Sequence, residues 1–426
     1  MTGTAGLTPR TTGLLLGAAL AVRLLLLAAS PRVGYFWDHD DFARLGLDTV
    51  DHGFLTVYDR PATPAVAVLP GAERRLGHRP FARRFDHPPL LGLSVAASGH
   101  LFVLLRPDRL VNTFESRLAF GIWNLLADLL LAFGGARLCR RLGGGEAEKR
   151  IAFVALLFLP PLVWGSATWG QLDAPAMALS LFMVLALVEG RPVRAGALFG
   201  LLAAFKPQAL FFVPVWGLAL STGRPRARYA AGLLSGAAAF ALAVLPHTLH
   251  SGLAWYRASW DIALPRLGDA TALHAYNVWY VDFLFGGDPR TSSLVLGAPR
   301  SAWGLASLGV ALAVAFAHVL RRWKAEPRGL LLFAGVSLLL AVLLPTGIHE
   351  RYVQYPLPFL VVAAAIHPPL RNGVALFTGA AFAQVAWPLW HGAGTPVPLL
   401  AVVTGTALAG AAVVLWQAAR LRPEDP

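Results

Sequence analysis

The chain has 426 residues, of which 56% are hydrophobic and 14% are charged, and its mean hydropathy is +0.58. Because soluble globular proteins are about one quarter charged, this composition argues against a soluble enzyme or a nucleic-acid-binding domain. The net charge of +13 comes mostly from arginines in short clusters between apolar runs, which is typical of a multi-pass membrane protein. Cys139 is the single cysteine, so no intrachain disulfide can form.

Apolar segments follow one another along the chain and approach the length of about 20 helical residues that crosses roughly 30 Å of hydrocarbon. In chain order they are residues 12–29, 88–105, 117–137, 151–168, 172–189, 193–221, 229–246, 301–320, 329–346, 353–366, 373–390 and 397–418. No small-residue cleavage site and soluble domain follow the first segment, so we expect it to be a retained helix that also directs insertion.

Two of these segments are not simple spans. If residues 88–105 crossed the membrane, the basic loops at 137–150 and 189–194 would lie outside, against the bias that keeps short basic loops in the cytoplasm. We therefore expect 88–105 to lie along the outer interface or to dip into it. The same topology requires 193–221 to form two short helices that meet at the outer face, where Pro207 breaks the helix.

The sequence thus predicts an all-α polytopic membrane protein with about 12 transmembrane helices and both termini in the cytoplasm. The outer side would receive a long first loop from about 31 to 116 and a second loop from about 247 to 300. Short outer turns are expected at 169–173, 205–208, 347–352 and 391–396. The unusual polar residues collect on this side, so we expect the functional site there.

The first outer loop opens with an acidic cluster, Asp38-His39-Asp40-Asp41, directly after the first helix. Neighbouring negative charges and removal from water make a carboxylate hold a proton more tightly, as a general base near neutral pH requires. A solvated acidic helix cap would have the same composition. The cluster could also chelate a divalent ion, because carboxylates and imidazole are competent ligands.

Four further polar breaks interrupt the apolar runs. They are Asp86-His87-Pro88-Pro89, Trp169-Gly170-Gln171-Leu172-Asp173, Lys206-Pro207-Gln208 and His349-Glu350-Arg351-Tyr352. A charge within a membrane is costly unless it is paired or serves a water-filled site, so four breaks on one side favour a shared site. In that site the two permanent cations, Lys206 and Arg351, together with His349 suit a phosphate group.

These motifs, in this order, resemble those of the GT-C superfamily of polytopic glycosyltransferases, which use polyprenyl-phosphate sugars. Asp38 resembles the acid of the first-loop motif of that superfamily. The segment Asp86-His87-Pro88-Pro89-Leu90 is similar to the HPPL element of the protein mannosyltransferases and of the glucosyltransferases of lipid-linked oligosaccharide assembly. The resemblance extends over residues 31–360.

Other elements are similar to bacterial proteins related to the GPI-anchor mannosyltransferases. Residues 169–173, 206–208 and 349–352 resemble the WGQxD, KPQ and HERY elements of that group. Residues 273–279 resemble its NAFNLW segment, with His274 at a position where asparagine is usual.

The resemblance implies a GT-C fold with interfacial helices in the first outer loop. It implies transfer of a hexose, mannose by preference, from a polyprenyl-phosphate donor to a hydroxyl of a lipid-linked glycan, a polymer or a protein, with inversion and on the outer face. Residues 1–366 would form the catalytic region, and 367–426 would add accessory transmembrane helices. Comparable members work without metal, so no cofactor is expected.

The resemblance also distributes roles among the residues. The candidates for the catalytic base are Asp38, which is preferred, Asp40 and Asp41. Lys206, His349 and Arg351 would hold the charge of the departing phosphate. The other substrate-binding candidates are Asp86, His87, Gln171, Asp173, Gln208, Asn277, Glu350 and Tyr352. Of these, Asp86 and His87 would orient the acceptor or assist the base.

Two other functional classes compete with the enzyme. A lipid or glycolipid transporter would explain Arg23, Asp128 and Lys206 as a substrate path within the membrane, although most polar residues cluster on one side. Asp128 fits the enzyme least, and we expect it to pair with Arg23 or to make a structural hydrogen bond. A noncatalytic assembly subunit would tolerate loss of the loop acids, yet Asp38 is present.

Overall fold

The structure is a computed structural model of the chain. It describes residues 8–34, 36–59, 85–223, 225–259, 270–273, 275–288, 290–323, 326–386 and 397–424. His274, the middle of the predicted first outer loop at 60–84 and the predicted outer turn at 391–396 lie outside these residues.

The described chain is almost entirely helical. Its α-helices are α1 (Pro9–Val33), α2 (Phe36–His52), α4 (Pro89–Leu105), α5 (Phe114–Arg141), α6 (Glu146–Phe158), α7 (Pro160–Trp164), α8 (Ala174–Val188), α9 (Pro192–Phe205), α10 (Val213–Thr222), α11 (Arg226–Ser251), α12 (Ala254–Arg257), α14 (Val278–Leu284), α15 (Arg300–Arg322), α16 (Pro327–Leu343), α17 (Leu357–Ile366), α18 (Arg371–Val385) and α20 (Val397–Arg420). The other helical turns are η1 (Phe54–Tyr58), η2 (Gly165–Trp169), η3 (Pro207–Phe212), η5 (Glu350–Gln354) and η6 (Pro368–Leu370). The strands, of two residues each, are β1 (Ala272–Leu273), β2 (Leu294–Val295), β3 (Ala298–Pro299) and β4 (Ile348–His349).

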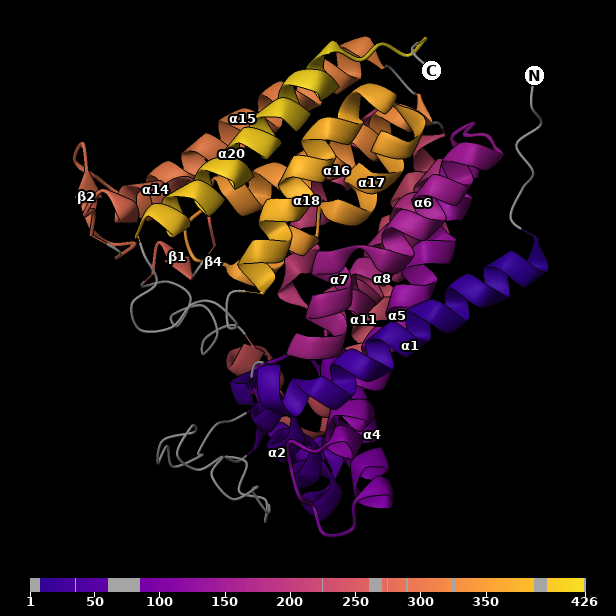
Figure 1. Cartoon of the computed structure of the whole chain (residues 1–426), viewed down its shortest axis with the longest axis vertical. Helices are drawn as coiled ribbons and strands as arrows, with labels where there is room; N and C mark the ends of the chain where they lie inside the picture. The colour runs from indigo at the N-terminus through magenta and orange to yellow at the C-terminus, as the bar shows by residue number, and fades with distance from the viewer. Residues whose placement is uncertain are drawn as a thin grey trace.

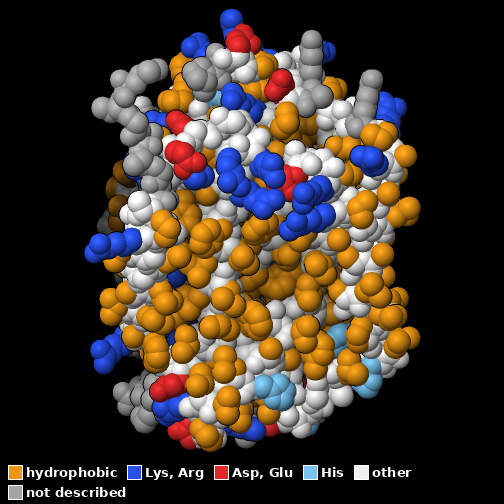
Figure 2. All heavy atoms as spheres, turned by 90° about the vertical axis from the view of Figure 1, so that its right-hand side faces the viewer, with side chains coloured by type: hydrophobic (Ala, Val, Ile, Leu, Met, Phe, Trp, Pro, Cys, Tyr) orange, Lys and Arg blue, Asp and Glu red, His pale blue; other side chains and the backbone are white. Residues whose placement is uncertain are grey.

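An apolar band separates two charged ends of the molecule. Figure 2 shows hydrophobic side chains across the middle of one face, with charged side chains gathered above and below them. Within the described residues, six helical segments are long and apolar enough to cross a membrane: α1, α5, Glu146–Trp169, α11, α15 and α20. The all-α membrane fold is therefore as predicted. The total of twelve spans stays a prediction, because the other apolar helices have 10–17 residues.

The apolar run 193–221 is broken in its middle, as predicted. Helix α9 ends at Phe205, Lys206 is extended with φ −149° and ψ 142°, and the chain continues from Pro207 in the 3-10 turn η3. Pro207 has no backbone N–H and disfavours helix at the residue before it. The break therefore places Lys206 between two helices.

A further break interrupts the run 151–168, which the sequence analysis treats as one helix. Helix α6 ends at Phe158, and Leu159 has the extended values φ −63° and ψ 115°. The chain then restarts as the short helix α7, with Pro160 in its first turn. The reason is again that proline disfavours helix at the preceding residue.

Helices α2 and α4 pack together below the bundle, at the lower end of Figure 1. Their backbones approach closely at Gly46 and Gly99, because a methyl group added to Gly99 would overlap the backbone of Gly46. Helix α4 also contacts α5, α9 and α11. The close contact fixes α2, which carries the first-loop acids, against the end of the bundle.

Helices α9 and α11 are joined by a second close backbone contact. A side chain added to Gly196 would overlap the backbone of Gly232, and one added to Gly200 would overlap that of Gly236. Small residues at a four-residue spacing allow helices in membranes to approach closely and to gain packing energy. Helix α9 is thereby held along much of its length.

The predicted second outer loop is hydrogen-bonded to the segment around His349. Strand β1 pairs in parallel with β4, with Ala272 opposite Ile348. In α18, the amide of Gln384 donates to the carbonyl of Glu350 at 2.6 Å and accepts from the backbone N–H of Tyr276 at 3.2 Å. The region predicted as accessory, 367–426, therefore supports this turn, and the boundary at 366 stays a prediction.

Asp128 makes the structural ion pair expected for it. Arg23 donates to Asp128 at 2.7 Å, and Ser166 donates to the same carboxylate oxygen at 2.6 Å. Both charged side chains are 1% exposed. Because each buried charge has its counter-charge, neither residue needs a substrate to neutralise it.

We predict that Gly99→Ala destabilises the protein. The added methyl group must push α2 and α4 apart, and overpacking of this kind costs about 1–3 kcal/mol. Thermal unfolding of the detergent-solubilised protein measures the effect. Gly17→Ala in α1 is the matched control, because nothing lies within 4 Å of the added carbon. Equal unfolding temperatures for the two variants would contradict the close contact.

Candidate active site

Three charged residues from three chain breaks meet in the centre of the site. Asp173 stands just before α8, Lys206 just after α9, and Arg351 lies in η5. The Lys206 ammonium donates to Asp173 Oδ1 at 2.5 Å, and Arg351 Nε lies 3.4 Å from Asp173 Oδ2. The three side chains are at most 12% exposed. Because buried charges must be paired, this contact holds the three breaks together.

A tyrosine completes the surroundings of Asp173. The hydroxyl of Tyr355, four residues after Arg351, donates to Asp173 Oδ1 at 2.9 Å. Burial alone would raise the pKa of Asp173, but the charges of Lys206 and Arg351 outweigh burial and hold this pKa below its usual value. Asp173 is therefore ionised at neutral pH and fixes the position of both cations.

Asp38 is oriented by a tryptophan from another break. It lies in the first turn of α2, and its Oδ2 accepts a hydrogen bond of 2.7 Å from Trp169 Nε1. Trp169 is 1% exposed and ends the π-helical turn η2, after which Gly170 takes a left-handed conformation with φ +82°. Glycine adopts this conformation without strain. The turn thus aims the indole N–H at the carboxylate.

His87 lies within electrostatic reach of Asp38 and of the two cations. Its ring packs against Phe42 and Phe85, each at a centroid distance of 5.7 Å, and Tyr58 donates to its carbonyl at 2.6 Å. Burial is the main cause that lowers the pKa of His87, and Lys206 and Arg351 lower it further, whereas Asp86 and Asp38 oppose them. The imidazole is therefore neutral at pH 7.

The electrostatic interactions connect these groups into one cluster. Asp38 interacts electrostatically with His87, Lys206 and Arg351. Asp86 joins through His87, at 3.7 Å between a carboxylate oxygen and Nε2. The structure thus brings together residues from all four polar breaks and from the acidic cluster, although they are up to 313 positions apart in sequence (351 minus 38).

His39 and Asp40, two other members of the acidic cluster, have hydrogen-bond partners outside the charged cluster. His39 contacts the Ser116 hydroxyl at 3.0 Å, and Asp40 accepts from Arg44 at 2.8 Å. Burial raises the pKa of Asp40 despite Arg44, so desolvation outweighs the paired charge. Asp41 is half-buried. Among the described residues, no group of three or more His, Cys, Asp or Glu side chains is arranged to hold a metal ion.

The segment His349-Glu350-Arg351-Tyr352 contributes other side chains besides Arg351. Glu350 is 6% exposed, and its carboxylate lies 3.9 Å from Arg351 and 3.6 Å from His349. The Arg351 guanidinium stands 5.5 Å from the ring centroid of Tyr352, a cation–π distance. The side chain of Gln208 is hydrogen-bonded to the hydroxyl of Tyr352. These contacts place Gln208, Glu350 and Tyr352 at the edge of the cluster.

For two predicted substrate-binding residues the described contacts lie outside the charged cluster, and their role in binding stays a prediction. Asn277 caps α14, where its Oδ1 accepts from the backbone N–H groups of Trp279 and Tyr280, and its amide donates to the carbonyl of Pro345 at 3.3 Å. The backbone carbonyl of Gln171 accepts a hydrogen bond of 3.0 Å from the side-chain amide of Asn124. No contact described for either residue joins it to the charged cluster.

Two residues of the site are absent from the sequence-based candidates. Arg117 is 3% exposed, donates twice to Asn112 Oδ1 at 2.8 and 3.1 Å, and acts electrostatically on Asp38 and Asp40. A sequence feature could have indicated Arg117, because this arginine stands at the predicted outer end of an apolar run, against the positive-inside bias. Tyr355 has no such signal, because an aromatic residue near a helix start is common at interfaces.

Two solved structures are similar to this chain. ArnT from Cupriavidus metallidurans bound to undecaprenyl phosphate is similar with a TM-score of 0.50 and 13% identity, over 95% of this chain and 76% of that chain. AglB from Archaeoglobus fulgidus, an archaeal oligosaccharyltransferase in complex with an inhibitory peptide and a dolichol-phosphate, has a TM-score of 0.43 and 12% identity, over 95% and 55%. No curated protein matches the chain.

The helical membrane fold is that of the GT-C glycosyltransferases, as the motif resemblance implies. The chain matches glycosyltransferase family 87 over residues 100–346, more than half of its length, and belongs to that family. The matched region includes Asp173 and Lys206, whereas Asp38 and Arg351 lie outside it.

We predict that Asp173→Asn strongly destabilises the fold. Lys206 and Arg351 would lose the carboxylate between them, and an uncompensated buried charge costs roughly 3–5 kcal/mol. Denaturant unfolding of the detergent-solubilised protein gives the change in free energy. Asp108→Asn, which removes an exposed carboxylate paired with Arg106, should leave the unfolding midpoint unchanged. A midpoint for Asp173→Asn equal to that of the control would refute the role of this carboxylate.

Proposed function

We propose that this protein transfers a hexose, mannose by preference, from a polyprenyl-phosphate donor to an acceptor hydroxyl, with inversion at the anomeric carbon. The observation that carries the proposal is the position of one carboxylate, Asp38, within electrostatic reach of two buried cations, Lys206 and Arg351. A glycosyltransferase that releases a lipid phosphate needs both a base for the acceptor and cations for the leaving group.

Asp38 is the base in this mechanism. Trp169 holds one carboxylate oxygen, and the other accepts the proton of the acceptor hydroxyl. The acceptor oxygen forms its bond to the anomeric carbon while the bond from that carbon to the phosphate oxygen breaks and its electron pair leaves with the phosphate. Neutral His87, beside Asp38 and Asp86, can donate a hydrogen bond that orients the acceptor.

The leaving phosphate is held by the cation pair. Lys206 and Arg351 lie against the carboxylates of Asp173 and Glu350, and both side chains carry further N–H donors that a phosphate can engage. Arginine and lysine are also the usual phosphate ligands, through charge-assisted hydrogen bonds. His349, with 24% of its side chain exposed, stands at the edge of this pair as a further donor.

A lipid-linked donor suits both the family and the fold. The chain is a family 87 glycosyltransferase in a membrane fold, and the similar ArnT structure was solved with undecaprenyl phosphate. A lipid phosphate would reach Lys206 and Arg351 from within the bilayer. The acceptor is a lipid-linked glycan, a polymer or a protein.

The distribution of arginines supports an outer-face site with cytoplasmic termini. Around Glu189, Arg137 donates at 2.6 Å and Arg141 at 3.0 Å. Arg137 and Arg141 lie in the last two turns of α5, and Glu189 directly follows α8, at the opposite end of that helix from Asp173. Because short basic loops stay in the cytoplasm, the opposite end, with the candidate site, faces outward.

The transporter alternative loses its main support in the ion pair between Arg23 and Asp128. These two intramembrane charges neutralise each other and therefore do not mark a substrate path. Lys206, the third, is paired with Asp173. The glycosyltransferase family adds to this argument.

We predict that Asp38→Asn lowers hexose transfer by a factor of roughly 10²–10⁴, the range of a general base. The assay measures transfer from a panel of polyprenyl-phosphate sugars by the protein in membrane vesicles. Asp51→Asn, in the same helix α2, removes an exposed carboxylate that pairs with Arg109 and should leave the rate unchanged. Full activity of Asp38→Asn would exclude Asp38 as the base.

Trp169→Phe should lower kcat by roughly 10–100-fold with little change in KM. It removes a hydrogen bond to a charged group, worth about 1.5–3 kcal/mol, that orients the base and not the donor. Steady-state kinetics with a varied donor concentration separates the two constants. Trp303→Phe, which removes an exposed indole that donates to the carbonyl of Val295, serves as the control. A raised KM with an unchanged kcat would mean that Trp169 binds substrate instead.

A further inference from the structure

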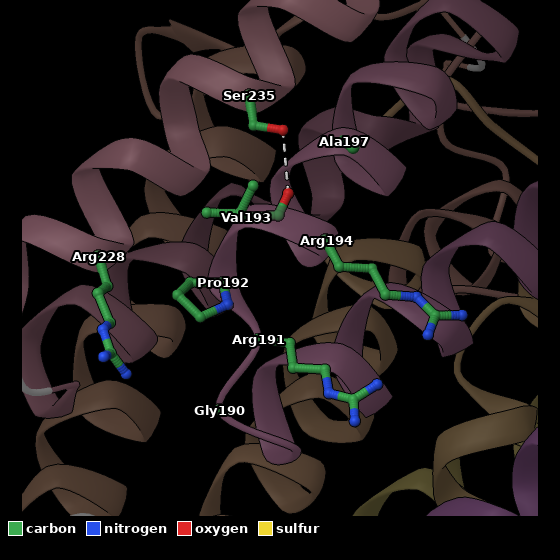
Figure 3. A pocket seen from close by; sticks show the side chains of 8 residues that line it. All are labelled: Gly190, Arg191, Pro192, Val193, Arg194, Ala197, Arg228 and Ser235. Atoms are coloured by element: carbon green, nitrogen blue, oxygen red, sulfur yellow. Dashed lines mark hydrogen bonds between the residues drawn. The ribbon is translucent and has the colours of Figure 1, made fainter.

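A basic groove lies between the first turns of α9 and α11. Figure 3 shows Arg228 on one side of Pro192, and Arg191 and Arg194 on the other. The groove has a volume of about 540 Å³. Because α9 runs from this groove to Lys206, the groove and the candidate active site lie at opposite ends of that helix, about 20 Å apart by helical rise.

The groove carries an excess of positive charge. The nearby carboxylate, Glu189, is already paired with Arg137 and Arg141, and it lies 3.6 Å from Arg191. For Arg194 and Arg228 the described part of the chain contains no ion-pair partner. Two guanidinium groups are therefore available to an anion.

The two helix starts add to this charge. Helix α9 begins at Pro192 and α11 at Arg226, and no side chain caps the free backbone N–H groups of either helix. A helix N-terminus carries a partial positive charge and presents N–H donors to anions. Together with the arginines, the groove is suited to a phosphate group.

One part of the groove is apolar or small. Val193 and Ala197 line it, and the hydroxyl of Ser235 is engaged with the carbonyl of Val193 at 3.0 Å. Next to the groove, Leu233 and Leu234 of α11 are 40% and 72% exposed. Only 17% of the apolar stretch of this helix is buried. Figure 2 shows basic side chains gathered where the apolar band ends on one face of the molecule. A groove that combines guanidinium groups with exposed apolar side chains suits a lipid and not a free anion.

We propose that this groove binds the phosphate of an anionic membrane phospholipid, with Arg194 and Arg228 at the headgroup and the acyl chains along Val193, Ala197 and the exposed leucines of α11. Basic pockets between transmembrane helices bind anionic lipid headgroups in this way. The site is separate from the proposed sugar transfer and does not depend on it.

Native mass spectrometry of the full-length protein in detergent tests the proposal. The probes are phosphatidylglycerol, phosphatidylcholine with the same acyl chains, and inorganic phosphate. We expect the wild type to retain phosphatidylglycerol in preference to phosphatidylcholine. Arg194→Glu with Arg228→Glu should reduce that retention by about tenfold or more. The matched control is Arg140→Glu with Arg150→Glu, an equal charge change at exposed positions, and it should retain the lipid.

Ala197→Phe provides a second variant without a charge change. Its ring would fill the groove, so phosphatidylglycerol should be lost although both arginines remain. Retention that is equal for the two lipids, or equal in the groove variant and the matched control, would overturn the proposal. Binding of inorganic phosphate that competes with the lipid would overturn the assignment to a lipid and indicate a free-anion site.

Discussion

The carboxylate of Asp173 is shared by Lys206, Arg351 and Tyr355, and the other parts of the site depend on this contact. The four residues come from the start of α8, the end of α9 and the turn before α17. A buried ion without its partner is strongly destabilising, so none of these breaks can move alone. The polar breaks in apolar runs are thus both the functional elements and the points at which the helices are fastened together.

The same arrangement gives the site its chemical asymmetry. On one side Lys206 and Arg351 lie against Asp173 and Glu350, and on the other side Asp38 is held by the indole of Trp169. Because these donors and charges are already in place, the proposed transfer would need little reorganisation when charge moves from the acceptor to the leaving phosphate. The buried Arg117 near Asp38 and Asp40 extends this preorganisation to the acidic helix α2.

Much of the site could be read from the sequence, because charged residues in apolar runs are rare and costly. The break at Pro207, the pair of Arg23 with Asp128 and the meeting of Lys206 with Arg351 follow from that cost. Neutral hydrogen-bonding residues carry no comparable signal, so Tyr355 and the orienting role of Trp169 emerged only from the geometry. The substrate-binding role predicted for Asn277 stays a prediction, and in the structure this residue of a family-like motif caps a short helix.

Helix α9 connects the basic groove to the charged cluster. Its first turn borders the basic groove and its last residue precedes Lys206, while Gly196 and Gly200 fasten its middle to α11. Backbones in such close contact cannot slide past each other without overlap. The position of Lys206 along the bundle is therefore set by the same helix pair that borders the basic groove. The basic groove lies at one end of that pair, and Lys206, paired with Asp173, lies at the other. Together they would hold the phosphate of the proposed donor at a fixed depth, and a site assembled from helix ends requires such a fixed position.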